Sequence, residues 1–232
     1  MARYQAHSWH VERADYFRVL ATYKLGGLYA DNDVEPLVPI DQWLPKFGYT
    51  ASVASNLLVV GVEFPRSRGG LSLQIVNYNF LSTHPGHPAL RAVIDAMNNA
   101  SAAMAEGADS VIFRTGPLAF TRGVFQWLGH GVDPAATEAS GVLFERTEEA
   151  GQWGDTGTRT GTGAGAGAGA GTGRRRRTWR LLVLPYRAFG HHPQHGRAPP
   201  HLNLSRWVPE TAAAIPLSNL EDAKVELKRG RL

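Results

Sequence analysis

The chain has 232 residues, of which 43% are hydrophobic and 19% charged, a composition typical of a folded chain with one large domain or two small ones. It contains no cysteine, which excludes disulfides, thiolate zinc sites and a cysteine nucleophile. No stretch approaches the ~20 consecutive apolar residues that cross a bilayer, and residues 1–30 hold no signal-peptide core. The sequence therefore predicts no membrane segment in this chain.

The excess of positive charge comes from a single run. Lys and Arg number 24 against 20 Asp and Glu, and four of those cations are residues 174–177. Without the run the two signs balance, so we expect no nucleic-acid partner, which would need a basic face spread over the domain. Such a run is typical of a solvated linker end; a nuclear-import or phosphate-binding patch is the alternative.

A glycine-rich segment divides the chain. Residues 151–173 hold 10 of the 26 glycines and end in an alternating Gly-Ala tract. With almost no side chain to bury, such a segment cannot offset the entropy of ordering its backbone. We predict a main body at 1–150, a disordered Gly/Ala-rich and Arg-rich insertion at 151–177, and a C-terminal strand and tail at 178–232.

Hydrophobic spacing predicts an alternation of helices and strands along the chain. The first helix is expected to end at Gly26-Gly27, because glycine adopts the left-handed conformation without penalty. The alternation indicates an α/β layered domain. In chain order we expect a helix at 14–25, strands at 28–30, 57–62 and 73–80, a helix at 88–104, a strand at 110–113, a helix at 117–128 and a strand at 179–184.

Two carboxylates follow the first predicted strand. Asp31 and Asp33 are one residue apart, so both can reach a hard divalent cation, which prefers oxygen ligands. By itself an Asp-x-Asp is more typical of a solvated turn.

The residues around this turn form a more specific pattern. Asp15 and Arg18 lie one helical turn apart, and Gly26-Gly27, Tyr29 and the Asp31–Asp33 triplet follow. The order and spacing closely resemble the DXD sugar-binding segment of glycosyltransferase family 32. Further segments are similar to the initiation-specific α-1,6-mannosyltransferase branch of that family, in the same order: 60–63, 85–88, 115–117, 184–190 and 201–207.

The resemblance implies an α/β fold of the GT-A (Rossmann-like) type, a nucleotide-sugar donor, Mn²⁺ or another divalent cation, and transfer with retention at the anomeric carbon. Family members usually have tens of residues before the DXD helix, and here only 13 precede Ala14. We therefore expect a domain that is incomplete at its N-terminus. By resemblance alone, the location is the Golgi lumen.

The resemblance also assigns roles in the donor site. Asp33 would be the direct metal ligand, and Asp31 would hold the metal through water or contact the donor. Asp15 and Arg18 would bind the sugar hydroxyls, with Arg18 near the phosphates, and Tyr29 would line the pocket. Without the DXD, Asp15 and Arg18 would read as a surface salt bridge.

The tail would complete the active site. His201 would be a further metal ligand, and Ser205 and Trp207 would donate hydrogen bonds to the diphosphate. A packed aromatic is the alternative for Trp207, and Ser205-Arg206 departs from the Gly-Ser of the family motif. The histidines at 191–201 favour a loop, with metal binding as the alternative.

Glu63 ends the predicted buried strand, at the edge where α/β sheets bind ligands. As a catalytic residue beside Asp31 and Asp33, it would orient the acceptor hydroxyl or steady developing positive charge. Asn77 and Asn79 favour a strand-end or turn role, with acceptor contact as the alternative.

These expectations together describe a metal-dependent retaining hexosyltransferase. It would move mannose from GDP-mannose onto a glycan hydroxyl, with a 1→6 linkage favoured. The alternatives are a galactosyltransferase or a sphingolipid mannosyltransferase of the same family, or a catalytically inactive truncated relative.

Overall fold

The computed structural model describes residues 4, 9–65, 70–100, 108–138, 140–149, 176–186, 188–189 and 204–207. The Gly-Ala tract, the histidines at 191–201 and the last 25 residues of the chain lie outside this part.

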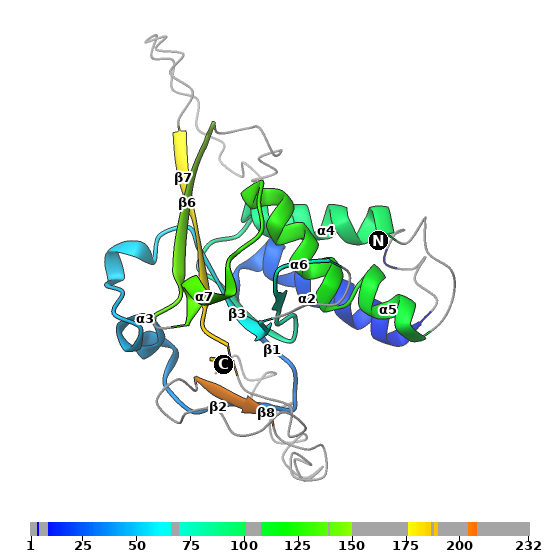
Figure 1. Ribbon diagram of the computed structural model, residues 1–232, viewed down its shortest axis with the longest axis horizontal. Coiled ribbons are helices and arrows are strands. Elements are labelled where there is room, and N and C mark those ends of the chain that lie inside the picture. The colour runs from blue at the N-terminus through cyan, green and yellow to red at the C-terminus, as the bar shows by residue number, and fades with distance from the viewer. Residues whose placement is uncertain are drawn as a thin grey trace, which may run out of the picture.

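A mixed sheet forms the centre of the molecule (Figure 1). Its β3 strand runs parallel to β7, while the other strand pairs described in the sheet are antiparallel. A short strand, β4 (Gln74–Ile75), pairs with the end of β3. The remaining order across the sheet is β1 (Gly27–Ala30), β5 (Asn79–Ser82), β3 (Leu57–Phe64), β7 (Arg176–Leu184) and β6 (Val142–Glu149).

The central strand β3 is buried on both faces, as its continuous apolar run predicts. Leu58 and Val60 belong to the core under the long helices. Leu57 and Val59 belong to a second core on the opposite face. Gly61 follows in the same strand, and a Cβ there would lie 2.8 Å from the ring of Phe189.

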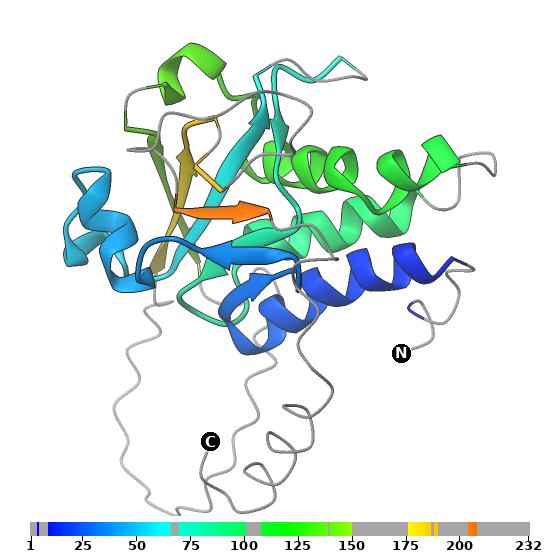
Figure 2. The same cartoon turned by 90° about the horizontal axis from the view of Figure 1, so that it is seen from below.

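Helices cover the two faces unequally (Figures 1 and 2). Four helices pack together on one face, and α6 approaches α4 so closely that a Cβ on Gly123 would lie 2.3 Å from the Cα of Val93. Those four are α2 (His10–Leu25), α4 (Pro88–Ala100), α5 (Ala108–Arg114) and α6 (Pro117–Leu128).

The other face carries short elements. They include a two-stranded sheet in which β2 pairs antiparallel with β8, seen in Figure 2 as blue and orange arrows. The set is β2 (Val34–Pro36), η1 (Ile40–Gln42), α3 (Trp43–Lys46), η2 (Ala51–Val53), α7 (Pro134–Thr137) and β8 (Ser205–Trp207).

Most predicted elements are confirmed, and one is wrong. Residues 110–113, predicted as a strand, lie in helix α5, and the carbonyl of Val111 accepts hydrogen bonds from the backbone of Thr115 and Gly116. A four-residue apolar run cannot distinguish a strand from a buried helix turn by periodicity. The predicted strand at 73–80 is two strands, β4 and β5, and the helix predicted at 88–104 is described as far as Ala100.

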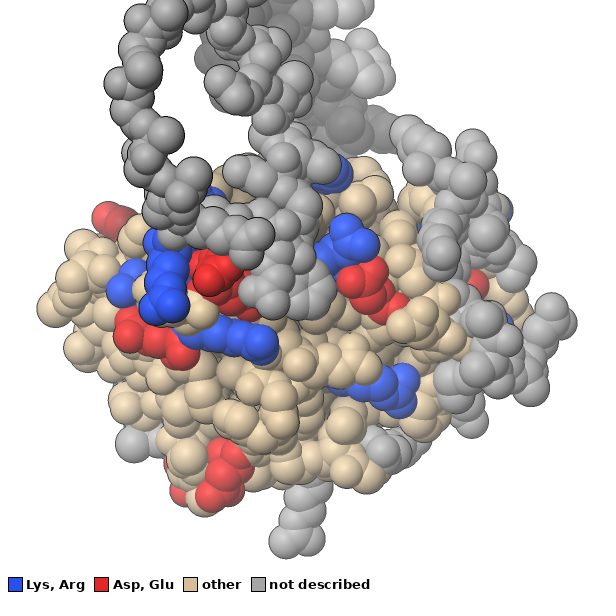
Figure 3. Space-filling view, turned by 90° about the horizontal axis from the view of Figure 1, so that it is seen from above, with Lys and Arg blue, Asp and Glu red and all other residues tan. Residues whose placement is uncertain are grey.

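The arginine run needs a second correction. Arg176 and Arg177, predicted to lie in the insertion, are the first residues of β7 and pair with Glu149 and Glu148 of β6. Sequence analysis missed β6 because an edge strand rich in charge has little hydrophobic pattern. On the described part of the face in Figure 3, basic and acidic side chains are interspersed.

Among the described helices, none combines the length and the apolar character needed to cross a membrane.

Candidate active site

A buried polar stripe runs along α2. Its residues recur at spacings of three or four, so they share one face of the helix, beside an apolar stripe that joins the core. Charged side chains are rarely buried unless they are paired, so the stripe marks α2 as more than a packing helix. The stripe consists of Glu12, Asp15, Arg18 and Thr22, all at most 7% exposed.

The chain reverses after α2 and places the DXD segment beside the stripe. Gly26 has a φ of 70°, as its predicted role as helix stop requires, and its N–H caps the carbonyl of Thr22. Strand β1 then pairs with β5, and the N–H of Asp31 donates to the carbonyl of Tyr78 at 2.9 Å. The N–H of Val34 donates to the carbonyl of Asp31 at 3.0 Å, so residues 31–34 form a tight turn between β1 and β2.

Arg18 lies at the centre of the site. Its Nη1 donates to the carbonyl of Asn77 at 3.0 Å, and its guanidinium lies 5.5 Å from the ring centre of Tyr29. Its Nη2 lies 3.2 Å from Asp15 Oδ1 and 3.5 Å from Asp31 Oδ2. The Nε is buried and has no hydrogen-bond partner among the described residues. The arginine is therefore fixed by protein groups on one side and keeps a donor for another oxygen.

Asp15 is held at both carboxylate oxygens. Asn77 Nδ2 donates to Oδ1 at 3.2 Å, and the Thr115 hydroxyl donates to Oδ2 at 3.0 Å. Burial raises the pKa of Asp15, and the charge of Arg18 opposes that rise. Asp15 and Arg18 therefore form a buried pair with hydrogen bonds, instead of the exposed salt bridge that was the alternative.

Tyr29 and Asp31 complete the group. The Tyr29 hydroxyl donates to Asp31 Oδ1 at 2.7 Å, so both oxygens of Asp31 already have partners in Tyr29 and Arg18. Burial, and then the hydrogen bond to Asp31, raise the pKa of Tyr29 to about 12, which keeps it a proton donor. Asp33 is half-buried in the turn, two residues from Asp31.

Glu63 and the two DXD carboxylates all lie near Tyr78, a residue that the sequence did not single out. Gln74 Nε2 donates to Glu63 Oε2 at 2.7 Å, and burial raises the pKa of Glu63 to about 7. Burial and then the nearby carboxylates of Glu63, Asp33 and Asp31 raise the pKa of Tyr78. The one signal for Tyr78 in the sequence is its position between Asn77 and Asn79.

The tail segment contributes one short strand next to the DXD turn. In β8, Trp207 is the register partner of Val34 and Ser205 that of Pro36. The backbone of β8 therefore runs beside the strand that directly follows Asp33. His201, predicted as a metal ligand, lies outside the described residues.

The carboxylates fit a hard cation in type but do not complete a site by themselves. Asp31 and Asp33 offer the oxygen ligands that Mn²⁺ accepts. Within the described part of the chain, no three His, Asp or Glu side chains come together as a metal-binding group. A cation here would need ligands from elsewhere, such as a diphosphate.

Comparison with known proteins finds a family match in the first part of the chain. Residues 2–48 match the family model described as a glycosyltransferase sugar-binding region containing a DXD motif. These residues contain α2, β1 and the DXD turn, so the match falls on the part of the chain that holds the buried polar stripe. The resemblance inferred from the sequence is thus confirmed.

The relatives include two initiation-specific mannosyltransferases and one putative glycosyltransferase. The chain is 26% identical over 140 residues to an initiation-specific alpha-1,6-mannosyltransferase of Schizosaccharomyces pombe, covering 55% of the chain and 34% of that protein. For the enzyme of that name from Candida albicans the identity is 28% over 137 residues, covering 51% and 35%. The chain is also 32% identical over 96 residues to the putative glycosyltransferase HOC1 of Saccharomyces cerevisiae. This match covers 39% of the chain and 24% of that protein. The matches span about a third or less of these relatives.

Proposed function

We propose that this chain is a metal-dependent, retaining glycosyltransferase that moves mannose from GDP-mannose onto a glycan hydroxyl in a 1→6 linkage. The observation that carries the proposal is Arg18, buried between Asp15 and Asp31 beside the DXD turn. The choice of mannose and of the linkage is supported by the names of the two mannosyltransferase relatives. The GT-A fold type and the Golgi lumen belong to the same proposal.

Arg18 would bind the donor at its diphosphate. Its buried Nε–H has no partner among the described residues and would donate a hydrogen bond to a phosphate oxygen. Because a guanidinium is always charged and rigid, it suits this role better than a lysine. Asp15 would hold Arg18 and a sugar hydroxyl, and Tyr29 would line the donor pocket.

Asp33 and Asp31 would hold the divalent cation. Asp33 would be the direct ligand, as the family resemblance implies. Asp31, whose two oxygens have protein partners in Tyr29 and Arg18, would act through water. His201 is proposed as a further ligand. When bound, the cation would neutralise charge on the departing diphosphate. Ser205 and Trp207, on the strand beside β2, would donate hydrogen bonds to the same group.

Glu63 would act on the acceptor side. Because its pKa of about 7 lies near neutrality, it can accept or donate a hydrogen bond and so orient the acceptor hydroxyl. In the transfer, the bond between the anomeric carbon and the diphosphate oxygen breaks and a bond to the acceptor oxygen forms. The acceptor proton passes to the departing diphosphate, and no protein nucleophile is required.

Calorimetric titration of GDP-mannose and UDP-galactose, with and without Mn²⁺, tests the proposal. We expect GDP-mannose to bind in a Mn²⁺-dependent manner, and Asp33→Ala to abolish that binding. Preference for UDP-galactose would replace the donor and keep the enzyme class. If the folded protein binds neither, the proposal is wrong.

A further inference from the structure

The corner between α5 and α6 contacts the polar stripe of α2 through two consecutive residues. Arg114 forms a buried ion pair with Glu12, and Thr115 donates to Asp15 at 3.0 Å. Glu12 and Asp15 are one helical turn apart on α2. The corner therefore contacts α2 at two successive turns.

The side chain of Thr115 points its hydroxyl at Asp15. It is fully buried, and its hydroxyl donates to Asp15 Oδ2 at 3.0 Å. The other oxygen of Asp15, Oδ1, accepts a hydrogen bond from Asn77 and forms the ion pair with Arg18. Partners on both oxygens fix the rotation of the carboxylate, so the loss of Thr115 would leave Asp15 held from one side.

The rotation of Asp15 matters because Arg18 is shared. Its Nη2 lies 3.2 Å from Asp15 and 3.5 Å from Asp31, so both carboxylates attract the guanidinium and together set its position. An Asp15 that turns away from Arg18 would let the guanidinium move toward Asp31 and the DXD turn. The orientation of the arginine thus depends on a hydroxyl that does not touch it.

We infer that Thr115 is a positioning residue for Arg18, acting through Asp15, with the Arg114–Glu12 pair fixing the corner that carries it. The part of this inference that concerns the donor rests on the proposed function. Thr115 lies between α5 and α6, outside the matched residues 2–48, so the inference extends the site to the α5–α6 corner.

The position of Arg18 can be measured without any donor. The buried Nε–H of Arg18 should give its own nitrogen–proton NMR signal, which Arg18→Lys removes and so assigns. Thr115→Val, which keeps the shape and deletes the hydroxyl, should shift that signal, whereas Thr115→Ser should leave it in place. Thr121→Val is the matched control, because Thr121 is equally buried but bonds to Pro117 and Ile75 instead of α2. An unshifted signal in Thr115→Val would overturn the inference.

Donor titration with the same variants tests the consequence. We expect Thr115→Val to weaken Mn²⁺-dependent binding of GDP-mannose about tenfold, the usual effect of losing one charge-assisted hydrogen bond. Thr115→Ser and Thr121→Val should bind like the wild type. Equal binding by Thr115→Val, or equal losses in both valine variants, would contradict the positioning role. A wild type that binds no donor would overturn the proposed function, while the NMR comparison still decides whether Thr115 positions Arg18.

Discussion

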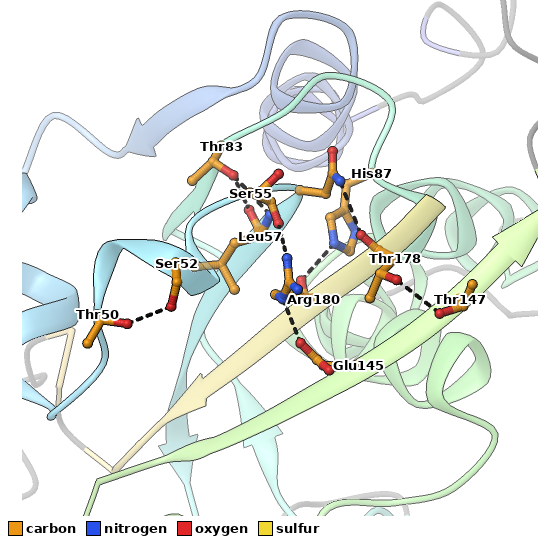
Figure 4. A network of polar contacts seen from close by, with 11 residues as sticks. Thr50, Ser52, Ser55, Leu57, Thr83, His87, Glu145, Thr147, Thr178 and Arg180 are labelled. Carbon is orange, nitrogen blue, oxygen red and sulfur yellow. Dashed lines mark hydrogen bonds and ion pairs between the residues drawn. The ribbon is translucent and has the colours of Figure 1, made fainter. Parts of the chain in front are cut away.

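Two groups of buried polar side chains, one around Arg18 and one around His87, differ in whether they stay charged. His87 is fully buried at the start of α4 (Figure 4). One ring nitrogen bonds to the carbonyl of Arg180 at 2.9 Å, and the other accepts from the N–H of Ala89 at 3.2 Å. Burial lowers the pKa of His87 to about 3, so the ring is neutral and both its nitrogens are satisfied within the protein.

The Arg18 group keeps its charges. A guanidinium lies between two carboxylates, and its buried Nε has no partner among the described residues. A buried group whose polar atoms are all satisfied internally serves the fold. One that keeps both signs of charge and a donor without an acceptor is a candidate functional site. The Arg18 and His87 groups differ in their partners: two carboxylates share Arg18, whereas both ring nitrogens of His87 bond to the backbone.

The largest expected effect is that of Arg18→Met. Removal of the cation leaves Asp15 without its charge partner in a buried position, at a cost of about 3–5 kcal/mol in the free energy of unfolding. Denaturation in urea measures the loss. Arg18→Lys keeps the charge and should lose less than half as much. Equal stability of Arg18→Met and wild type would mean that the buried pair contributes nothing.

An effect spread over several pH units, and smaller than that of Arg18→Met for each unit, is expected from acid on the His87 group. The folded-state pKa of about 3 lies below the ordinary value of 6.5, so below pH 6.5 the unfolded state binds a proton that the folded state does not. Stability should therefore fall as the pH drops from 6.5 toward 3, by about 1.4 kcal/mol per unit for this group. His87→Gln should lose this slope. Unfolding measured at several pH values checks the difference, and parallel curves would contradict it.

Glu63 should give the opposite slope and a smaller one. Its folded-state pKa of about 7 lies above the ordinary 4.5, so the folded state holds the extra proton between these values. Stability should fall as the pH rises from 4.5 to 7, by about 1 kcal/mol in total because the residue is only half-buried. Glu63→Gln should remove the fall. A variant that keeps the wild-type slope would show that another group titrates there.

The smallest effect is expected at the surface. Arg91 and Asp95 form an exposed ion pair at 3.0 Å, one turn apart on α4. Because water screens such a pair, Arg91→Ala should change the free energy of unfolding by less than about 0.5 kcal/mol. A loss comparable to that of Arg18→Met would show that burial does not separate the two kinds of pair.

Local signals made the first part of the site predictable. The helix before Gly26, the strand after it and the DXD turn all follow from residues that are neighbours in the chain, and the structure has them in that order. The family pattern selected Asp15 and Arg18 on that helix. Their shared network could not be predicted, because its partners Asn77 and Thr115 are distant in the sequence.

Tertiary packing determines the secondary structure of two segments whose local sequence pattern was ambiguous. Residues 110–113 contain adjacent β-branched and aromatic residues, yet they form a helix because α5 packs against α2, α4 and α6. Arg176 and Arg177 read as part of a solvated run, but they face acidic residues across a strand pair. In both places a tertiary contact overrode the local pattern.

A single donor titration compares the two groups most directly. GDP-mannose with Mn²⁺ is titrated into wild type, Arg18→Lys and His87→Gln, each shown to be folded. The account predicts that Arg18→Lys weakens binding about a hundredfold, since lysine has no counterpart of the Nε–H that would donate to the phosphate, while His87→Gln stays within about twofold of wild type. Equal losses in the two variants, or an Arg18→Lys that binds like the wild type, would contradict the claim that the buried Arg18 group is the donor site.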